Sequence, residues 1–93
     1  MELNLSQVSA FVALVEEGHF GRAAQRLYLT TPAVSKRIQG LERQLRVQLL
    51  IRDPAGGVAL TSAGEQFVGA AGLLLQQATD ARALLARTTA HSM

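Results

Sequence analysis

One segment of the sequence, residues 27–42 (LYLTTPAVSKRIQGLE), contains side chains that could bind a polyanion. Lys36, Gln39 and Arg43 follow one another at steps of three and four, a spacing that puts them on one face of a helix. Lysine and arginine side chains can reach phosphate oxygens or the edge of a guanine base. This face could therefore bind double-stranded DNA.

The same face is low in bulk, because small residues surround its polar side chains: Ala33, Ser35 and Gly40. Small side chains let a helix backbone approach the major groove, which is about 12 Å wide. Apolar residues lie on the opposite side, and we expect them to be buried: Val34, Ile38, Leu41 and Leu45. A helix whose polar face meets only water would show the same periodicity. The Thr30-Thr31-Pro32 start, after a short helix with paired alanines, favours DNA.

Positive charge is concentrated in the middle of the chain. Residues 22–52 hold seven basic residues and a single acid, Glu42, for a net charge of +6, whereas the rest of the chain carries −4. A basic segment in an otherwise acidic chain suggests a polyanion-binding surface. A solvated helix surface is the alternative on charge alone.

Composition narrows the possible functions. Ninety-three residues, 48% of them hydrophobic, make one domain with room for an appended helix. The chain has no cysteine, which excludes disulfides and thiolate chemistry. His19 and His91 stand in no metal-ligand or nucleophile spacing, and the adjacent Glu16 and Glu17 suit a solvated helix end. We therefore expect no catalysis, no metal and no cofactor.

No pattern for crossing a membrane is visible. The longest apolar run, FVGAAGLLL at residues 67–75, is far shorter than the roughly 20 residues that a membrane helix needs. The start, MELNLSQ, has neither the basic region nor the cleavage site of a signal peptide. We expect a cytoplasmic protein without a membrane partner.

Two helices are predicted before the basic face. The first runs from about residue 5 to 17, with Asn4 as its N-cap and Gln7 in a capping box. Gly18 is a typical residue after a helix end. The second is short, at about 22–27, and weakly capped, because Gly21 stands where a hydroxyl residue would be better.

A third helix follows a three-residue break. Pro32 suits the first turn of a helix, so Thr30 or Thr31 is the expected N-cap, and the helix runs to about residue 46. Helix, turn and helix form a helix-turn-helix at about residues 19–38. In this arrangement the second helix enters the major groove.

A hairpin and a long helix complete the chain. Two short β-rich runs flank the turn PAGG at residues 54–57, which predicts a small hairpin that would form a wing. Ser62 and Glu65 form a capping box that opens a helix from about residue 63 to 87.

Residues of this long helix recur at steps of four and three, the pattern of a coiled-coil seam. The seam residues are Phe67, Ala71, Leu74, Ala78, Ala81 and Leu85. Small side chains in the seam suit a close helix pair, so we expect a homodimer through this helix. A helix packed on its own domain is the alternative.

These segments together resemble the N-terminal DNA-binding region of LysR-type transcriptional regulators. The resemblance lies in FVALVEEGHFGRAAQRL, TTPAVSKRIQGLERQL, LLIRD and VALTSAG, in this order. It implies a mostly α fold: a winged helix-turn-helix of three helices and a two-stranded wing at residues 1–61, then a linker helix at residues 62–90 that pairs two subunits antiparallel. In the family a C-terminal effector-binding domain follows, which is absent here, and dimers often form tetramers.

The family pattern also implies contacts with DNA. Major-groove contacts fall on Thr31, Pro32, Ser35 and Lys36, with Ala33 at the closest approach. Phosphate contacts fall on Thr30, Arg22 and Arg52. With Gln39 and Arg43 from the basic face, these are the DNA-binding residues that we predict.

Four positions depart from the family pattern. Thr31 stands where glutamine is usual and is too short for a bidentate contact with adenine. His19 and Gly21 replace hydroxyl residues, which removes a side-chain phosphate donor. Arg46 replaces the common glycine after the third helix. In addition, the turn DPAGG (53–57) lacks the basic residue that many members insert into the minor groove.

The sequence thus predicts sequence-specific binding to double-stranded DNA as a dimer, as the DNA-binding part of a bacterial transcriptional regulator. The alternative is a helical homodimer that serves protein–protein contacts only. Such a module would explain the seam but not the +6 segment at residues 22–52.

Overall fold

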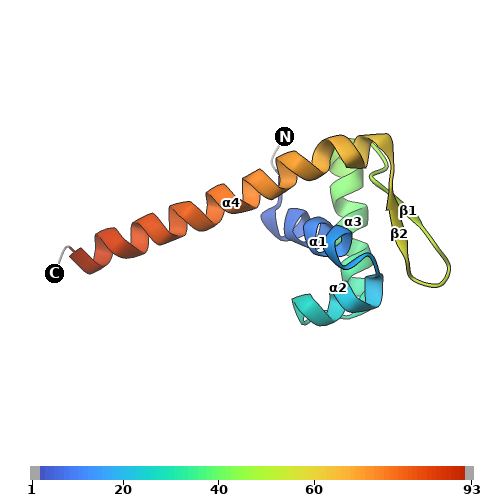
Figure 1. Cartoon of the computed structure of the whole chain (residues 1–93), viewed down its shortest axis with the longest axis horizontal. Helices are drawn as coiled ribbons and strands as arrows, with labels where there is room; N and C mark the ends of the chain where they lie inside the picture. The colour runs from blue at the N-terminus through green and yellow to red at the C-terminus, as the bar shows by residue number, and fades with distance from the viewer. Residues whose placement is uncertain (1–2, 92–93) are drawn as a thin grey trace.

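The computed structural model describes residues 3–91, and the side chains of residues 3–87. The elements are α1 (Leu5–Glu17), α2 (Phe20–Leu27), α3 (Thr31–Leu45), β1 (Leu50–Arg52), β2 (Val58–Leu60) and α4 (Ser62–His91). Figure 1 shows α1, α2 and α3 as one body, the β1–β2 hairpin beside α3, and α4 crossing the body and then running out from it. The fold is the expected one, a winged helix-turn-helix followed by a long helix.

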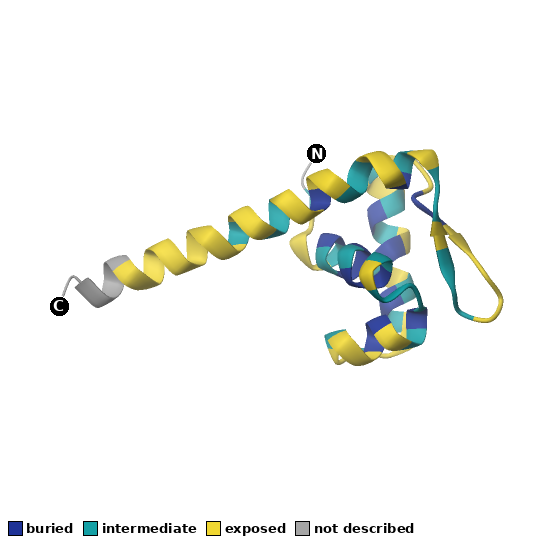
Figure 2. Cartoon of the chain, viewed as in Figure 1, coloured by how far each residue is buried: buried dark blue, intermediate teal, exposed yellow. Residues whose placement is uncertain are grey.

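The core lies around α1, which packs against α2, α3 and α4. Helix α1 is buried on several sides, and its buried residues are Val8, Ala10, Phe11, Ala13 and Leu14. On α3 three of the four predicted stripe residues, Val34, Ile38 and Leu41, are completely buried. The fourth, Leu45, is partly buried and packs against the core. Figure 2 shows this buried layer between the three helices, with the opposite flank of α3 exposed.

Gly40 packs against α1 rather than leaving room for DNA, so that expectation was wrong. A Cβ at Gly40 would collide with the side-chain amide of Gln7. The capping box at Gln7 was also wrong, because its Oε1 is buried without a hydrogen-bond partner. Asn4 does cap α1: its Oδ1 accepts the backbone N–H of Ser6 at 2.9 Å. The small residue on α3 therefore serves helix packing.

Two helix starts differ from the prediction. Helix α2 begins at Phe20, two residues early, because His19 is its N-cap and accepts the N–H of Gly21 through Nδ1 at 3.0 Å. Helix α4 begins after Thr61 rather than Ser62. The Thr61 Oγ1 accepts the N–H of Gly64 at 3.0 Å and donates to the carbonyl of Gln48 at 2.6 Å. The cap of α4 thus also ties this helix to the chain before β1.

A carboxylate fixes the path from α3 into the wing. Oε2 of Glu42 accepts the backbone N–H groups of Leu49 and Leu50 at 2.8 and 3.3 Å. The hairpin then pairs Leu50 with Leu60 and Arg52 with Val58 in an antiparallel register. Leu50 is part of the core, and Val58 and Leu60 pack against it. These contacts set the position of the wing relative to α3.

The end of α3 contains a backbone strain that can be removed. Arg46 is the C-cap and adopts a left-handed conformation with φ 56°, which costs an L-residue about 1–2 kcal/mol. Arg46→Gly should therefore raise the free energy of unfolding by about 1 kcal/mol, measured by urea denaturation. The converse control is Gly18→Ala, where φ is 71° and no atom lies within 4 Å of the added Cβ; it should destabilise by a similar amount. A less stable Arg46→Gly protein would contradict the strain.

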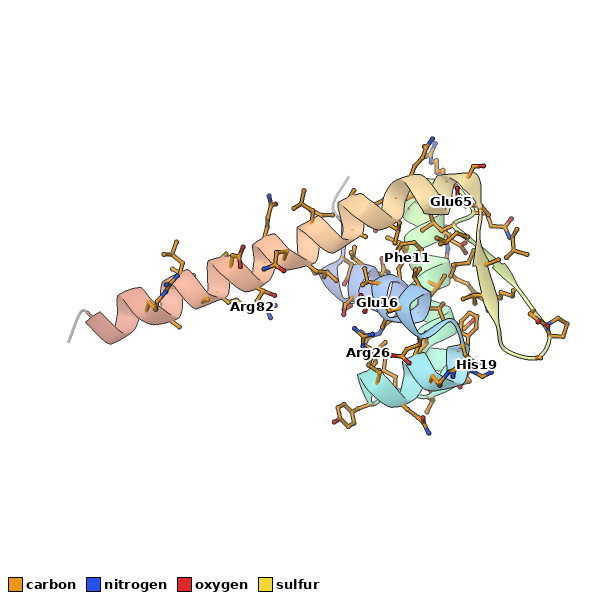
Figure 3. All side chains as sticks on the ribbon, in the orientation of Figure 1. Phe11, Glu16, His19, Arg26, Glu65 and Arg82 are labelled. Carbon is orange, nitrogen blue, oxygen red and sulfur yellow. The ribbon has the colours of Figure 1, made fainter. Side chains whose placement is uncertain are left out.

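Only the first part of α4 belongs to the body. The ring centroids of Phe67 and Phe11 are 5.6 Å apart, and Ala71 is completely buried. Figure 3 labels Phe11 on α1, below α4. From Thr79 to Arg87 every described side chain is exposed. The helix has 30 residues, about 45 Å at 1.5 Å per residue. Two seam residues, Phe67 and Ala71, thus contribute to the core of the monomer.

Candidate nucleic-acid interface

The exposed flank of α3 forms an open hollow of about 500 Å³. Half of the predicted DNA-binding residues line it: Pro32, Ala33, Ser35, Lys36 and Gln39. Lys36 and Gln39 are exposed, and the buried stripe lies on the other side of the helix. The hollow therefore presents one cation, one hydroxyl and one amide on a face that the core does not use.

The N-terminal end of α3 lies beside α2, on the side of the body away from α4 (Figure 1). Thr31 and Pro32 are exposed there, and Oγ1 of Thr30 caps the helix by accepting the N–H of Ala33 at 3.3 Å. A helix N-terminus carries a partial positive charge, which favours an approaching phosphate. Arg43, also exposed, lies about three turns further along the helix.

Arg52 connects the wing to α3 before any ligand binds. Its Nη1 donates to Oγ of Ser35 at 2.6 Å, and its guanidinium carbon lies 4.7 Å from the centroid of the Phe20 ring. The cation over the ring is held by a cation–π contact. Two residues that we predicted as separate DNA contacts therefore form a pair, which no local sequence pattern indicates because they are 17 positions apart.

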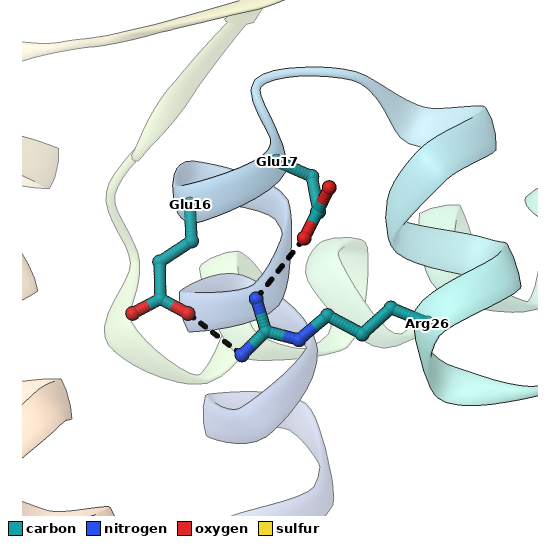
Figure 4. A network of polar contacts seen from close by, with 3 residues as sticks. All are labelled: Glu16, Glu17 and Arg26. Carbon is teal, nitrogen blue, oxygen red and sulfur yellow. Dashed lines mark hydrogen bonds and ion pairs between the residues drawn. The ribbon is translucent and has the colours of Figure 1, made fainter.

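Arg26 of α2 forms ion pairs with two acids at the end of α1. Its guanidinium nitrogens lie 2.7 Å from Oε1 of Glu16 and 3.3 Å from Oε2 of Glu17 (Figure 4). The hydrogen bond to Glu16, followed by the charges of both acids, raises the pKa of Arg26. We expected Glu16 and Glu17 to be a solvated helix end without a partner. This expectation was wrong, because both acids pair with Arg26. Arg22 lies exposed on the same helix α2.

Arg37 is a basic residue that the sequence analysis did not place in the site. It lines a second hollow, of about 350 Å³, together with Lys36, Ala33 and the start of α1 at residues 4–7. Because Arg37 follows the flank and is half-buried, the helical pattern did not select it. The packing of α3 against α1 brings Arg37 beside residues about 30 positions earlier in the chain, so no local sequence pattern indicates this position.

The wing turn contains no basic side chain. Its geometry is that of a tight turn: the N–H of Gly56 donates to the carbonyl of Asp53 at 2.9 Å, and Oδ1 of Asp53 accepts the N–H of Ala55 at 3.0 Å. Within the part of the chain that the structure describes, no group of acids and histidines could hold a metal ion, and no helix is long and apolar enough to cross a membrane.

Residues 5–65 match the family model of the bacterial regulatory helix-turn-helix proteins, lysR family. Among curated relatives, the uncharacterized HTH-type transcriptional regulator YnfL of Escherichia coli (strain K12) is 43% identical over 83 residues, which are 89% of this chain and 28% of the relative. The HTH-type transcriptional regulator TfdT of Cupriavidus pinatubonensis (strain JMP 134 / LMG 1197) is 42% identical over 73 residues, 78% of this chain and 32% of TfdT. The chain thus spans about a third of the length of these relatives.

Solved structures agree with the family model. The crystal structure of the CbnR_DBD–DNA complex has a TM-score of 0.84 and 32% identity, and covers 98% of this chain and 100% of that chain. The BenM_DBD/catB site 1 DNA complex has a TM-score of 0.86 and 34% identity, and covers 94% and 97% of the two chains. With the winged helix-turn-helix and the matched residues, this chain belongs to the lysR family of bacterial regulatory helix-turn-helix proteins.

Proposed function

We propose that this chain binds double-stranded DNA sequence-specifically as a dimer, and that it is the DNA-binding part of a cytoplasmic bacterial transcriptional regulator. The flank of α3 enters the major groove, and α4 joins two subunits. In a longer protein these dimers pair into tetramers.

The observation that carries the DNA-binding proposal is the exposed, slim and cationic flank of α3. The small side chains of Ala33 and Ser35 leave the hollow open. Lys36 supplies the cation, and the amide of Gln39 supplies both a hydrogen-bond donor and an acceptor. A base edge in the major groove presents donors and acceptors that such side chains can read. The CbnR and BenM domains with the same fold are described in complexes with DNA, which supports this use of the flank.

Around this flank, phosphate contacts come from α2, from β1 and from other positions of α3. Arg22 on α2, Arg52 on β1 and the capped N-terminus of α3 at Thr30 are all exposed. Arg37 adds a cation beside the start of α1. Phosphate contacts orient a protein on the duplex, whereas base contacts select the sequence. We therefore assign base reading to Thr31, Pro32, Ser35, Lys36 and Gln39, and backbone contacts to the arginines.

The dimerisation proposal rests on the part of α4 that extends beyond the body, residues 79–87, where the side chains are exposed. Leu84 and Leu85 are 58% and 66% exposed in the monomer, and both lie beyond the part of the helix that packs on the body. An isolated helical segment of this length is marginal in water, so a second copy that covers these leucines would stabilise it. Because Phe67 and Ala71 are already used in the core, the interface is carried by the rest of the seam: Leu74, Ala78, Ala81 and Leu85.

Salt dependence separates this function from a protein-interaction module. For a protein that neutralises several phosphates, the logarithm of the DNA-binding constant falls linearly with log[salt]. The slope is proportional to the number of phosphate contacts. Fluorescence anisotropy with duplexes selected from random DNA should show this steep slope. A flat response, or no binding to any duplex, would favour the alternative of a homodimer that only contacts other proteins.

Lys36→Ala tests the base-reading role of the flank. We expect operator binding to weaken by about 1–3 kcal/mol and preference to relax at one base position, because Lys36 is exposed in the hollow and makes no core contact. Arg87→Ala is the matched control, since it also removes one positive charge but lies near the far end of α4. Equal weakening for all duplex sequences would instead assign Lys36 to phosphate.

A further inference from the structure

The imidazole of His19 joins the start of α2 to the turn of the wing. Its Nδ1 accepts the N–H of Gly21 at 3.0 Å, and its Nε2 lies 3.1 Å from the carbonyl oxygen of Ala55, 36 positions later. Figure 3 shows His19 at this junction. A carbonyl can only accept and an amide N–H can only donate. The ring that makes both bonds is therefore neutral, with its hydrogen on Nε2.

Two glycines leave the space that this ring occupies. A Cβ at Gly21 would lie 3.1 Å from Cε1 of His19, and a Cβ at Gly56 would lie 2.8 Å from the same atom. Gly56 also has φ 99°, which side chains rarely adopt, whereas Gly21 has an ordinary helical backbone. The space around the ring thus explains Gly21: a larger residue there would crowd the imidazole.

Further contacts hold the wing to the same point. The N–H of Phe20 donates to the carbonyl of Gly56 at 2.9 Å, and His19 forms a backbone bridge with Gly57. The Phe20 ring lies under the guanidinium of Arg52 from β1. The pair His19–Phe20 therefore contacts the hairpin at both its turn and its first strand. Since the turn has no basic side chain, its position relative to α3 is what these contacts control.

We propose that His19 is a positioning residue for DNA binding: its neutral imidazole fixes the wing turn, so that the backbone of residues 53–57 meets the DNA beside the groove that α3 occupies. His19 itself does not touch DNA. The proposal rests on the proposed function and adds to it a side chain outside the recognition helix. It also explains the departures from the family pattern at His19 and Gly21 together. The imidazole of His19 caps α2, and the absence of a side chain at Gly21 leaves the space that this ring needs.

The first test compares the wild-type chain with His19→Ser. A serine can still cap α2 but cannot reach the carbonyl of Ala55. Amide hydrogen exchange should become faster at Phe20 and Asp53, which donate to the turn, and stay unchanged in α1 and α3. Hydroxyl-radical protection of the selected duplex should decrease at the flanks of the site but not at its centre. The footprint is the readout rather than the total affinity, because the serine hydroxyl can itself donate to a phosphate.

The second test is a double-mutant cycle with Gly21→Ala. In the wild-type background the added methyl crowds the ring, so exchange at Phe20 should become faster. In the His19→Ser background the ring is absent, and alanine, the better helix former, should leave exchange unchanged or slow it. This change of sign is specific to the contact between residues 19 and 21. The ¹⁵N shifts of the wild-type imidazole should report a bare Nδ1 and a protonated Nε2.

The outcomes distinguish the two proposals. Wild-type exchange and footprints in His19→Ser, or an imidazole with its hydrogen on Nδ1, would overturn the role of His19 while leaving DNA binding intact. Failure of the wild-type chain to bind any duplex would overturn the proposed function, and with it the positioning role. Faster exchange at the turn, a footprint lost only at the flanks and the sign change in the cycle would support both.

Discussion

Leu85→Glu is expected to make the protein monomeric and to weaken its binding to a duplex with two half-sites by about 10²–10⁴-fold, the gain that linking two sites provides. Leu85 is 66% exposed in the monomer, so the change leaves the core untouched. In the proposed dimer the same position lies in the α4 seam, where a carboxylate would be buried without a partner. Sedimentation equilibrium and fluorescence anisotropy measure the two effects.

Ala83→Glu is the matched control for this prediction. Ala83 is exposed on the same helix, and its substitution by glutamate adds the same charge as Leu85→Glu. The two positions lie about 160° apart around the helix. We expect this variant to remain dimeric. A duplex with a single half-site should bind Leu85→Glu and the wild type alike, because only the linkage between subunits is lost. An intact Leu85→Glu dimer would place the interface on another face of α4.

Gly64→Ala is expected to lower the free energy of unfolding by about 2–4 kcal/mol. A Cβ at Gly64 would overlap the backbone carbonyl of Leu49 and lie 3.0 Å from Cδ2 of Leu60. The carbonyl cannot move aside easily, because it accepts the N–H of Thr61 at 3.0 Å. The glycine in VALTSAG thus permits the close approach of α4 to the chain that enters the wing.

The same helix provides the control for this clash. Gly72 has no atom within 4 Å of an added Cβ and is exposed, so Gly72→Ala should raise the free energy of unfolding by about 0.5–1 kcal/mol through helix propensity. Urea denaturation with an unchanged slope measures both variants. Equal stability of Gly64→Ala and the wild type would show that α4 can shift away from Leu49 at little cost.

The double use of α4 explains why its sequence pattern alone was ambiguous. We weighed a dimer seam against a helix packed on its own domain, and the structure assigns Phe67 and Ala71 to the second role. Both readings predict apolar residues at the same steps, since any helix that buries one face shows this period. The dimer through Leu74, Ala78, Ala81 and Leu85 stays a prediction.

The sequence by itself determined the features that depend on neighbours along the chain. The bounds of α1, the cap at Thr30 and the buried stripe of α3 are as predicted. Caps and helical faces involve residues three or four positions apart, so a short window of sequence contains the whole interaction. The exposed flank with Lys36 followed from the same local periodicity.

Only the tertiary structure decided which distant residues meet. Arg52 reaches Ser35 and His19 reaches Ala55, across 17 and 36 positions, and Gly40 lies against Gln7 rather than in the DNA-facing flank. A glycine, a histidine or an arginine has several possible uses, and the choice among them depends on the atoms that folding brings within a few ångströms. Packing of separate elements sets those distances, and no spacing along the chain contains them.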